Sequence, residues 1–430
     1  MERVSFDQFT PSNLEEWKAI VSKDLKGKSY DETLVKYTDD AIRVEALFNS
    51  ENSPKTELPY ARGVKHDNSW KINEDVFFST PKEGNVKALK ALASGANSVT
   101  FIGNITSLKD AEVLLKDVML DIIDSYYTCS ETSCAFISEY LEKNYSKINL
   151  TGGFLLEKVS SQNLYTSPLF SFYTVNGYNF NSNGATTVQE LALCLAKGNE
   201  LLHQLVENNI DVDDASAQLK FTLGCSPNYF EEIAKIRALR TLWSNVVNAY
   251  NPQHNCSKVA YVMSKTSTFY LAGVDVNNNI LRNTTQAMSA VLGGCNVLTV
   301  APHNFDNTND FALRIARNIQ LILQEESYFN KVADIGGGAY FIEYLTDKLC
   351  EKAWQLFQQI EAKGGFSAFK NSGELDTLLN ESLTKKKIAV EQKQKTVIGV
   401  NKYPNANDKN VVNTDKHHLT SFLEKQSATI

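Results

Sequence analysis

Runs of extended apolar residues alternate with amphipathic helical patterns along most of the chain. Residues 169–175, Leu-Phe-Ser-Phe-Tyr-Thr-Val, have the length of a strand and are rich in aromatic and β-branched side chains. A polar stretch with two glycines follows at 177–184, and leucines at 191, 195, 202 and 205 then repeat at helical spacing. The pattern predicts a strand, a loop at 177–184 and a helix from Thr186 or Thr187. A loop after the carboxyl end of a strand is where β/α proteins usually place their chemistry, so this loop is a candidate site.

The same alternation recurs about eight times over roughly 300 residues, which favours a parallel sheet closed into a barrel. We predict an α/β fold, a TIM (β/α)8 barrel with an N-terminal extension arm and a short C-terminal segment. Strands are predicted at 98–102, 135–138, 154–156, 169–175, 218–223, 258–263 and 296–300. Helices are predicted at 13–25, 108–118, 186–208, 228–248, 278–292 and 310–327, the first of them capped by Ser12 or Asn13.

Composition narrows the class of protein. The 430 residues are 43% hydrophobic, enough for a large core, and the formal net charge of -7 does not suggest nucleic acid or an anionic membrane as partner. The first residues lack the features of a signal peptide and no apolar run reaches transmembrane length, so we expect a cytoplasmic protein. The 7 scattered cysteines favour reduced thiols over disulfides. Cys129 and Cys134, with no histidine nearby, are a weak metal signal.

Several motifs occur in a fixed order. Gly177-Tyr178 is followed by Gly184-Ala185-Thr186 and by Gln189-Glu190-Leu191-Ala192. This pattern resembles a stretch of the coenzyme B12-dependent acyl-CoA mutases, above all methylmalonyl-CoA mutase. Further segments are similar to the same family at 221–224, 233–243, 276–294, 311–326, 334–345 and 399–403, so the resemblance covers about residues 55 to 404.

The resemblance assigns no catalytic residue to this chain. In the family's catalytic chains a histidine follows the Gly-Tyr pair and hydrogen-bonds the thioester carbonyl of the substrate, whereas this sequence has Asn179. Those chains also carry a longer insertion, with a tyrosine that contacts substrate and cofactor, between an Arg-Gly pair and a Trp-x-Ile element. Here only residues 64–69 separate Arg62-Gly63 from Trp70. Two parts of the active site are therefore expected to be missing.

The resemblance also predicts no cofactor site in this chain. Catalytic mutases continue into a cobalamin domain whose Asp-x-His-x-x-Gly motif supplies a histidine to cobalt. Asp415-Lys416-His417-His418-Leu419-Thr420 imitates that motif, but Thr420 replaces the glycine, and a doubly wound domain needs of order 100 further residues. We expect no cofactor and no metal to be bound by this chain, with adenosylcobalamin held in the partner subunit.

The expected organisation is an N-terminal arm for subunit contact at 1–60, a barrel at 61–365, and a post-barrel helical segment with a polar tail at 366–430. The resemblance implies the small, non-catalytic subunit of a heterodimeric methylmalonyl-CoA mutase, which interconverts methylmalonyl-CoA and succinyl-CoA, with a large catalytic subunit as its partner. Two alternatives stay open. One is a catalytic acyl-CoA mutase half used with a separate cobalamin-binding chain, and the other is a sensor that binds an acyl-CoA.

Other residues have a plainer interpretation. Arginines on the predicted helices are interpreted as surface ion-pair formers rather than ligand contacts. They are Arg237, Arg240, Arg314 and Arg317. Gly336-Gly337-Gly338 lacks the Gly-Lys-Ser/Thr continuation of a phosphate loop and is interpreted as a turn. His303 is the only histidine in a predicted barrel loop, so it is a candidate ligand contact.

The strand at 169–175 carries aromatic side chains on both faces. One face takes Phe170, Phe172 and Thr174, and the other takes Leu169, Ser171, Tyr173 and Val175. In the catalytic chains of the resembling family, the pantetheine arm of CoA threads the barrel axis. Because either face brings a ring inward, we predict a closed axis without a channel for CoA.

Overall fold

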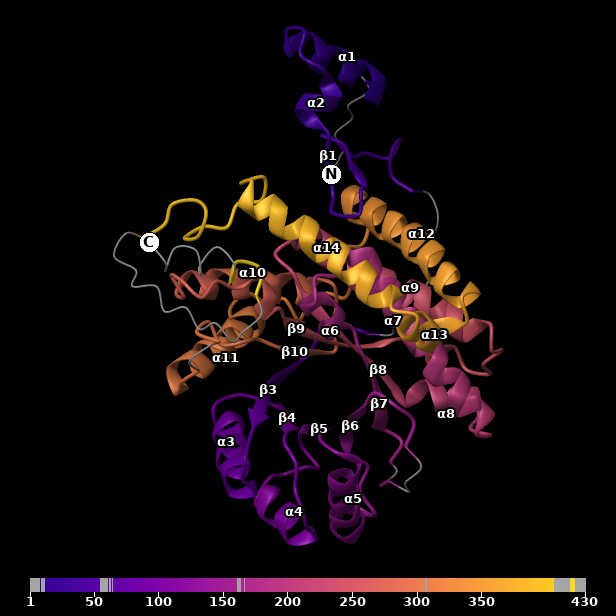
Figure 1. Cartoon of the computed structure of the whole chain (residues 1–430), viewed down its shortest axis with the longest axis vertical. Helices are drawn as coiled ribbons and strands as arrows, with labels where there is room; N and C mark the ends of the chain where they lie inside the picture. Colours follow the sequence, from indigo (N-terminus) through magenta and orange to yellow (C-terminus); the bar gives the residue numbers. More distant parts are fainter. Residues whose placement is uncertain are drawn as a thin grey trace.

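The computed structural model describes residues 8, 12–54, 61, 63, 65–160, 164–165, 167–305, 308–405 and 418–421. Parallel strands close into a barrel in the order β10-β3-β4-β5-β6-β7-β8-β9 (Figure 1). They are β3 (Lys71–Phe77), β4 (Ser98–Ile102), β5 (Asp124–Thr128), β6 (Thr151–Leu156), β7 (Phe170–Asn176), β8 (Leu219–Cys225), β9 (Tyr261–Thr266) and β10 (Val297–Thr299). The predicted α/β TIM barrel is confirmed.

Helices between the strands surround the barrel (Figure 1). They are α3 (Pro81–Ala93), α4 (Leu108–Leu114), α5 (Glu131–Tyr145), α6 (Gly177–Ser182), α7 (Thr187–Glu207), α8 (Val212–Ala217), α9 (Tyr229–Asn248), α10 (Asn278–Leu292) and α11 (Asp310–Glu325). After the barrel come α12 (Tyr340–Ala362), which packs on α7 and α9, then α13 (Gly365–Asn371) and α14 (Glu374–Glu391). Within the described part of the chain, no helix has both the length and the apolar character needed to cross a membrane.

Most predicted elements lie within a few residues of the observed ones, but the predicted strand at 135–138 is wrong. Those residues lie in α5, and the strand of that repeat is β5. Asp124 and Ser125 of β5 are buried, where Asp124 accepts a hydrogen bond from Thr151 at 2.7 Å and Ser125 accepts one from Tyr127 at 3.2 Å. Buried polar residues with side-chain partners interrupt the apolar pattern of β5, so this strand has no hydrophobic signature in the sequence.

The segment before the barrel contains two helices and a short pair of strands. α1 (Leu14–Asp24) begins with a capping box, in which Asn13 and Glu16 each accept from the other's amide. The helix α2 (Tyr30–Leu34) and the antiparallel strands β1 (Lys36–Tyr37) and β2 (Arg43–Val44) follow. The β1–β2 turn reaches the barrel, because Asp40 accepts from the Val188 amide of α7 at 3.0 Å. Figure 1 shows α1 and α2 at the opposite end of the molecule from α4 and α5.

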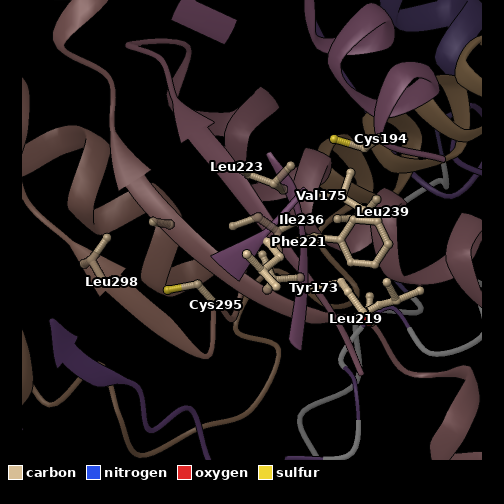
Figure 2. Close-up of a cluster of buried hydrophobic side chains, with 14 of the residues drawn as sticks. Tyr173, Val175, Cys194, Leu219, Phe221, Leu223, Ile236, Leu239, Cys295 and Leu298 are labelled. Carbon is tan, nitrogen blue, oxygen red and sulfur yellow. The ribbon is translucent and has the colours of Figure 1, made fainter. Parts of the chain in front are cut away.

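The largest apolar core lies between the barrel strands and the surrounding helices. Phe221 of β8 meets Trp243 of α9 with ring centroids 4.8 Å apart. Figure 2 shows Tyr173 and Val175 of β7 in the same cluster as Phe221 and Leu239. These side chains face the helices, so residues that alternate with them face the barrel interior.

A bulge in β7 changes which of its residues face the helices. The amides of Phe172 and Tyr173 both donate to the Gln218 carbonyl, at 3.3 and 3.0 Å, so two residues of β7 lie opposite one residue at the start of β8. Phe170 and Phe172 both contact the Phe154 ring of the outer core, with centroids 5.3 and 6.3 Å away, and Tyr173 lies in that core as well. The prediction that β7 brings a ring into the axis is therefore wrong, because the strict alternation on which it rested is broken at the bulge.

Candidate functional site at the carboxyl end of the barrel

Asn179 lies on a short helix and not in a loop. α6 begins directly after β7, because the Asn176 side chain accepts from the Asn179 amide at 3.3 Å and caps the first turn. The prediction of a loop at 177–184 is therefore wrong over the length of α6. The Asn179 side chain is exposed and lines a pocket of about 590 Å³ between α6, the carboxyl ends of β6 and β7, α13 and α14. We call it the outer pocket.

The preceding residue, Tyr178, faces the carboxyl mouth of the barrel. Its hydroxyl oxygen is 3.1 Å from Thr268 Oγ1, and Lys265 Nζ lies 5.3 Å from its ring centroid. Lys265 also forms an ion pair with Asp75 at 2.5 Å. Burial alone would lower the pKa of Lys265, but the Asp75 carboxylate and the Tyr178 hydroxyl together outweigh burial, and the pKa is raised. These contacts join α6, β9 and β3 across the mouth.

A cavity of about 710 Å³ opens at this mouth, and we call it the mouth cavity. Its walls come from the carboxyl ends of β3, β9 and β10 and from α11. Apolar residues form much of the wall, among them Val76, Phe77, Val300, Pro302, Phe305 and Leu313. Tyr178 lines the cavity, but Asn179 does not. Its volume is in the range of small-molecule sites.

Among the described residues, every cationic side chain that lines the mouth cavity is paired with a carboxylate of this chain. Besides Lys265, they are Arg317, which forms a buried ion pair with Glu74, and Lys87, which pairs with Glu83 at 2.7 Å. Burial raises the pKa of Glu74 against the opposing effect of Arg317. The mouth therefore has little unpaired positive charge for an anionic ligand.

Toward the amino ends of the strands, three side chains meet inside the barrel. The hydroxyl oxygens of Tyr126 (β5) and Tyr261 (β9) are 3.1 Å apart, and Lys220 Nζ (β8) lies 4.7 Å from the centroid of each ring. Because β5 is adjacent to neither β8 nor β9, these contacts cross the barrel interior. We call Tyr126, Lys220 and Tyr261 the axial plug.

Lys220 is held in the axial plug without a carboxylate in direct contact. Its ammonium donates to the Gly152 carbonyl at 2.6 Å, and burial lowers the pKa of Lys220 to about 7. None of the three plug residues lines the mouth cavity. The rings that occupy the axis thus come from β5 and β9, and not from β7.

Comparison with known proteins adds to this geometry. The family model described as methylmalonyl-CoA mutase matches residues 157–430. The methylmalonyl-CoA mutase small subunit of Porphyromonas gingivalis is 31% identical over 93% of this chain and 71% of its own length. The chain belongs to the methylmalonyl-CoA mutase family. It also aligns with the methylmalonyl-CoA mutase of Rhizobium meliloti, with 30% identity over 92% of this chain and 64% of that protein. The methylmalonyl-CoA mutase large subunit of Streptomyces virginiae is 28% identical over 90% of this chain and 62% of that subunit.

The motif residues that resemble the mutase family form a buried charge cluster beneath α6. Lys235 Nζ lies 2.9 Å from Glu190 and 2.6 Å from Glu232, and all three side chains are almost fully buried. Glu190 also accepts from the Gly224 amide at 2.9 Å and from Asn181 of α6 at 3.1 Å. The Gln-Glu-Leu-Ala motif therefore fixes α6 to β8, α7 and α9, which is a positioning role.

The arginines of the 233–243 motif are buried, so the prediction that they are surface residues is wrong. Arg237 forms ion pairs with Asp334 and Glu343, as expected for its charge, but its side chain is only 2% exposed. Arg240 donates to the backbone carbonyls of Gly293 and Gly294 and forms no ion pair within the described residues. Both arginines hold the barrel wall and do not line the mouth cavity.

Other predicted site residues lie apart from the mouth cavity. Arg314 is exposed on α11, whereas Arg317 is buried and lines the cavity, which the surface interpretation missed. His303 is buried and does not line the cavity, although the neighbouring Pro302 does. Gly336-Gly337-Gly338 lies in a turn, as predicted. Asp415, Lys416, His417 and much of the Leu58–Gly63 element lie outside the described residues.

Sequence reasoning missed the residues that shape the mouth and the axis. Lys220 carried a usable signal, because it is a charged residue between two apolar neighbours in a strand, where alternation places it on the opposite face. Tyr126 and Tyr261 carried none, because only the closed barrel brings β5 and β9 together. Lys265 and Asp75 pair across strands separated by β10, which is equally invisible in the sequence.

Proposed function

We propose that this chain is the small, non-catalytic subunit of a heterodimeric methylmalonyl-CoA mutase. The axial plug is the observation that carries the proposal. A CoA thioester threaded along the axis would have to displace Tyr126, Lys220 and Tyr261 from a packed site, and losing one buried aromatic ring costs about 3 to 5 kcal/mol. The likeness to the small subunit of Porphyromonas gingivalis supports the same assignment.

The position of Asn179 also supports a non-catalytic role. A group that polarises a thioester carbonyl must reach hydrogen-bond distance of that oxygen. Asn179 lines the outer pocket, and the residue that does face the mouth, Tyr178, shares its hydroxyl hydrogen bond with Thr268. We infer that this chain does not polarise a substrate carbonyl.

The described residues of the mouth do not fit adenosylcobalamin either. The lining of the mouth cavity contains neither histidine nor cysteine, so it offers no strong axial ligand for cobalt. We place the cofactor, which supplies the radical chemistry of the mutase reaction when it is bound, in the large subunit. The role we assign to this chain is to support that subunit.

Residues 1–60 are our proposed arm for contact with the large subunit. Against the described residues of the chain, no residue of α1 is fully buried, and Ile20 on it is 63% exposed. Obligate interfaces commonly bury upwards of about 2,000 Å² and are more apolar than the remaining surface. We expect Ile20→Asp to weaken co-purification with the large subunit. Val86→Asp is the matched control, because Val86 on α3 is 58% exposed at the other end of the molecule.

Reconstitution of turnover tests the proposed function directly. The purified chain, given methylmalonyl-CoA and adenosylcobalamin, should produce no succinyl-CoA, while the chain together with its large subunit should turn over. Asn179→Ala should leave the rate of the reconstituted complex unchanged within about twofold, as should Asn183→Ala, an exposed asparagine just beyond the same helix. Turnover by the isolated chain, or a tenfold loss confined to Asn179→Ala, would contradict the proposal.

Two further measurements separate the alternatives. Isothermal titration of the purified chain with CoA esters should show no binding, whereas an acyl-CoA sensor would bind without the large subunit. Addition of a free cobalamin-binding chain should not start turnover, whereas a catalytic half would become active.

A further inference from the structure

Two cysteine thiols lie side by side at the start of α5. Cys129 directly follows β5, Ser130 caps α5, and Cys134 lies in the first turns of the helix. The two Sγ atoms are 3.3 Å apart. The residue before a helix cap and the fourth residue of the helix are the positions at which a hydrophobic staple forms, so local helix geometry explains why these thiols meet.

The surroundings hold both thiols in place. The Ser130 amide donates to Asn104 at 2.8 Å. Ser133 Oγ donates to the Ile105 carbonyl at 2.9 Å and accepts from the Ile105 amide at 3.0 Å. The β4–α4 connection is thereby fixed to the first turn of α5, and the two sulfurs do not depend on a flexible loop to meet.

The two sulfurs differ in access to solvent. Cys129 is partly exposed and Cys134 is fully buried. The hydrogen bond between Cys134 and Cys129 and the burial of Cys134 both raise the pKa of the Cys134 thiol. A reagent in solution therefore reaches Cys129 first. Cys134 is positioned to react with an oxidised Cys129 sulfur.

We propose that Cys129 and Cys134 are a reversible modification site, which a hydroperoxide converts into an intrachain disulfide. The Cys129 sulfur attacks the outer peroxide oxygen, the O–O bond breaks, and an alcohol or water leaves. The resulting sulfenic acid is attacked by the Cys134 sulfur, so that the S–S bond forms, the S–O bond breaks and water leaves with the Cys134 proton. The two thiols lose two electrons in total and the peroxide gains them. The sulfurs need to approach by only about 1.3 Å to reach bonding distance.

A bound metal fits these thiols less well than a disulfide does. Structural zinc takes four ligands, and no group of three or more histidine, cysteine or acidic residues able to hold a metal occurs within the described ranges. The plainer interpretation is a staple of two small apolar side chains that stay reduced. The two interpretations predict different products after oxidation, a disulfide or two unchanged thiols. The product can be measured on the whole chain.

Peptide mapping after oxidation tests the proposal. Cleavage at Glu131 separates Cys129 from Cys134, so in the reduced protein the two fragments part. After treatment with hydrogen peroxide and blocking of free thiols, we expect the fragments to stay joined until a reductant is added. In Cys134→Ser, Cys129 should instead be trapped as a sulfenic acid by dimedone. In Cys129→Ser, Cys134 should stay reduced. All measurements are made in a Cys256→Ser background, because Cys256 is exposed and would link chains together.

A second probe does not depend on oxidation. A trivalent aryl arsenical such as phenylarsine oxide chelates two neighbouring thiols, so one equivalent should block both Cys129 and Cys134, and a dithiol should release it more readily than a monothiol. Each serine variant should lose this stable complex while keeping a native circular dichroism spectrum. The proposal is overturned if peroxide treatment leaves separate fragments with two free thiols. It is also overturned if Cys129→Ser retains the arsenical as well as the parent chain does.

Discussion

Replacing Lys235 with methionine should destabilise the fold through the two carboxylates that the change leaves behind. Lys235 pairs with Glu190 and Glu232 and also donates to the Gly224 carbonyl, and its side chain is completely buried. Methionine has a similar length and leaves no large cavity. The main consequence is therefore electrostatic, because two acidic groups stay enclosed without their common cation.

The structure sets the expected magnitude. Removing one partner of a buried ion pair costs about 3 to 5 kcal/mol, because the other charge stays buried and uncompensated. Lys235→Met leaves two such groups and should lie at the upper end of that range. Glu190→Gln should cost less, about 1 to 3 kcal/mol, because Lys235 keeps Glu232 and the new amide oxygen can still accept from Gly224.

The pH dependence gives the prediction its sharpest form. Burial raises the pKa of Glu190 even with Lys235 present, and Lys235 is the group that opposes this shift most. Without Lys235 the folded-state pKa rises further. A raised folded-state pKa means that stability is present at low pH and is lost as the pH rises through that value. The loss in free energy of unfolding caused by Lys235→Met should therefore become smaller as the pH falls from 7 toward 5.

Urea unfolding followed by circular dichroism measures this deficit. Glu83→Gln is the matched control, because Glu83 and Lys87 form an exposed i,i+4 pair on α3, and no measurable change is expected there. The reasoning is refuted if Lys235→Met is as stable as this control. It is also refuted if the free energy of unfolding lost by Lys235→Met increases as the pH is lowered. A changed urea slope would indicate instead that unfolding no longer occurs in one step.

Two further predictions concern the mouth and the axial plug. Asn179→His should not give the isolated chain mutase activity in the presence of adenosylcobalamin. One added hydrogen bond supplies only a few kcal/mol of a much larger barrier reduction, and residue 179 lines the outer pocket. Detectable succinyl-CoA would contradict this prediction. Lys220→Met should stabilise the fold at pH 6, by up to about 5 kcal/mol, and this advantage should fade toward pH 10. The folded-state pKa of Lys220 is lowered to about 7, so its contribution to stability is present above the unfolded pKa and is lost as the pH falls through about 7. Urea unfolding across this pH range checks the trend, and a constant difference would refute it.

Elements whose apolar residues recur at the spacing of a strand or a helix were predicted best. β4 was placed to the residue, because Val99 and Phe101 alternate with polar positions and are buried. α10 was placed to the residue as well by its helical spacing, although several of its buried positions are polar. β3 and β5 were not predicted as strands, because polar groups such as Asn73 and Asp124 face partners inside the barrel. In a barrel with a polar interior, strands carry a weaker signal than the helices that cover them.

The geometry of the candidate site could not be predicted from the sequence for a different reason. The sequence placed the candidate site at the end of β7, where α6 follows directly and Asn179 lines the outer pocket instead of the mouth cavity. Tyr178, Lys265 and Arg317 reach the mouth from three separate elements. Their meeting depends on barrel closure, which no local pattern specifies.

The axial plug has a consequence for how anything would enter and leave the mouth cavity. A barrel threaded from end to end can admit one molecule as another departs at the far side. Here Tyr126, Lys220 and Tyr261 stand between the mouth and the amino ends of the strands, so the cavity has a floor. Molecules then enter and leave the mouth cavity through one opening, so the first occupant has to depart before a second can bind. If the proposed large subunit covers that opening, the contents of the cavity can change only as often as the two subunits separate or shift.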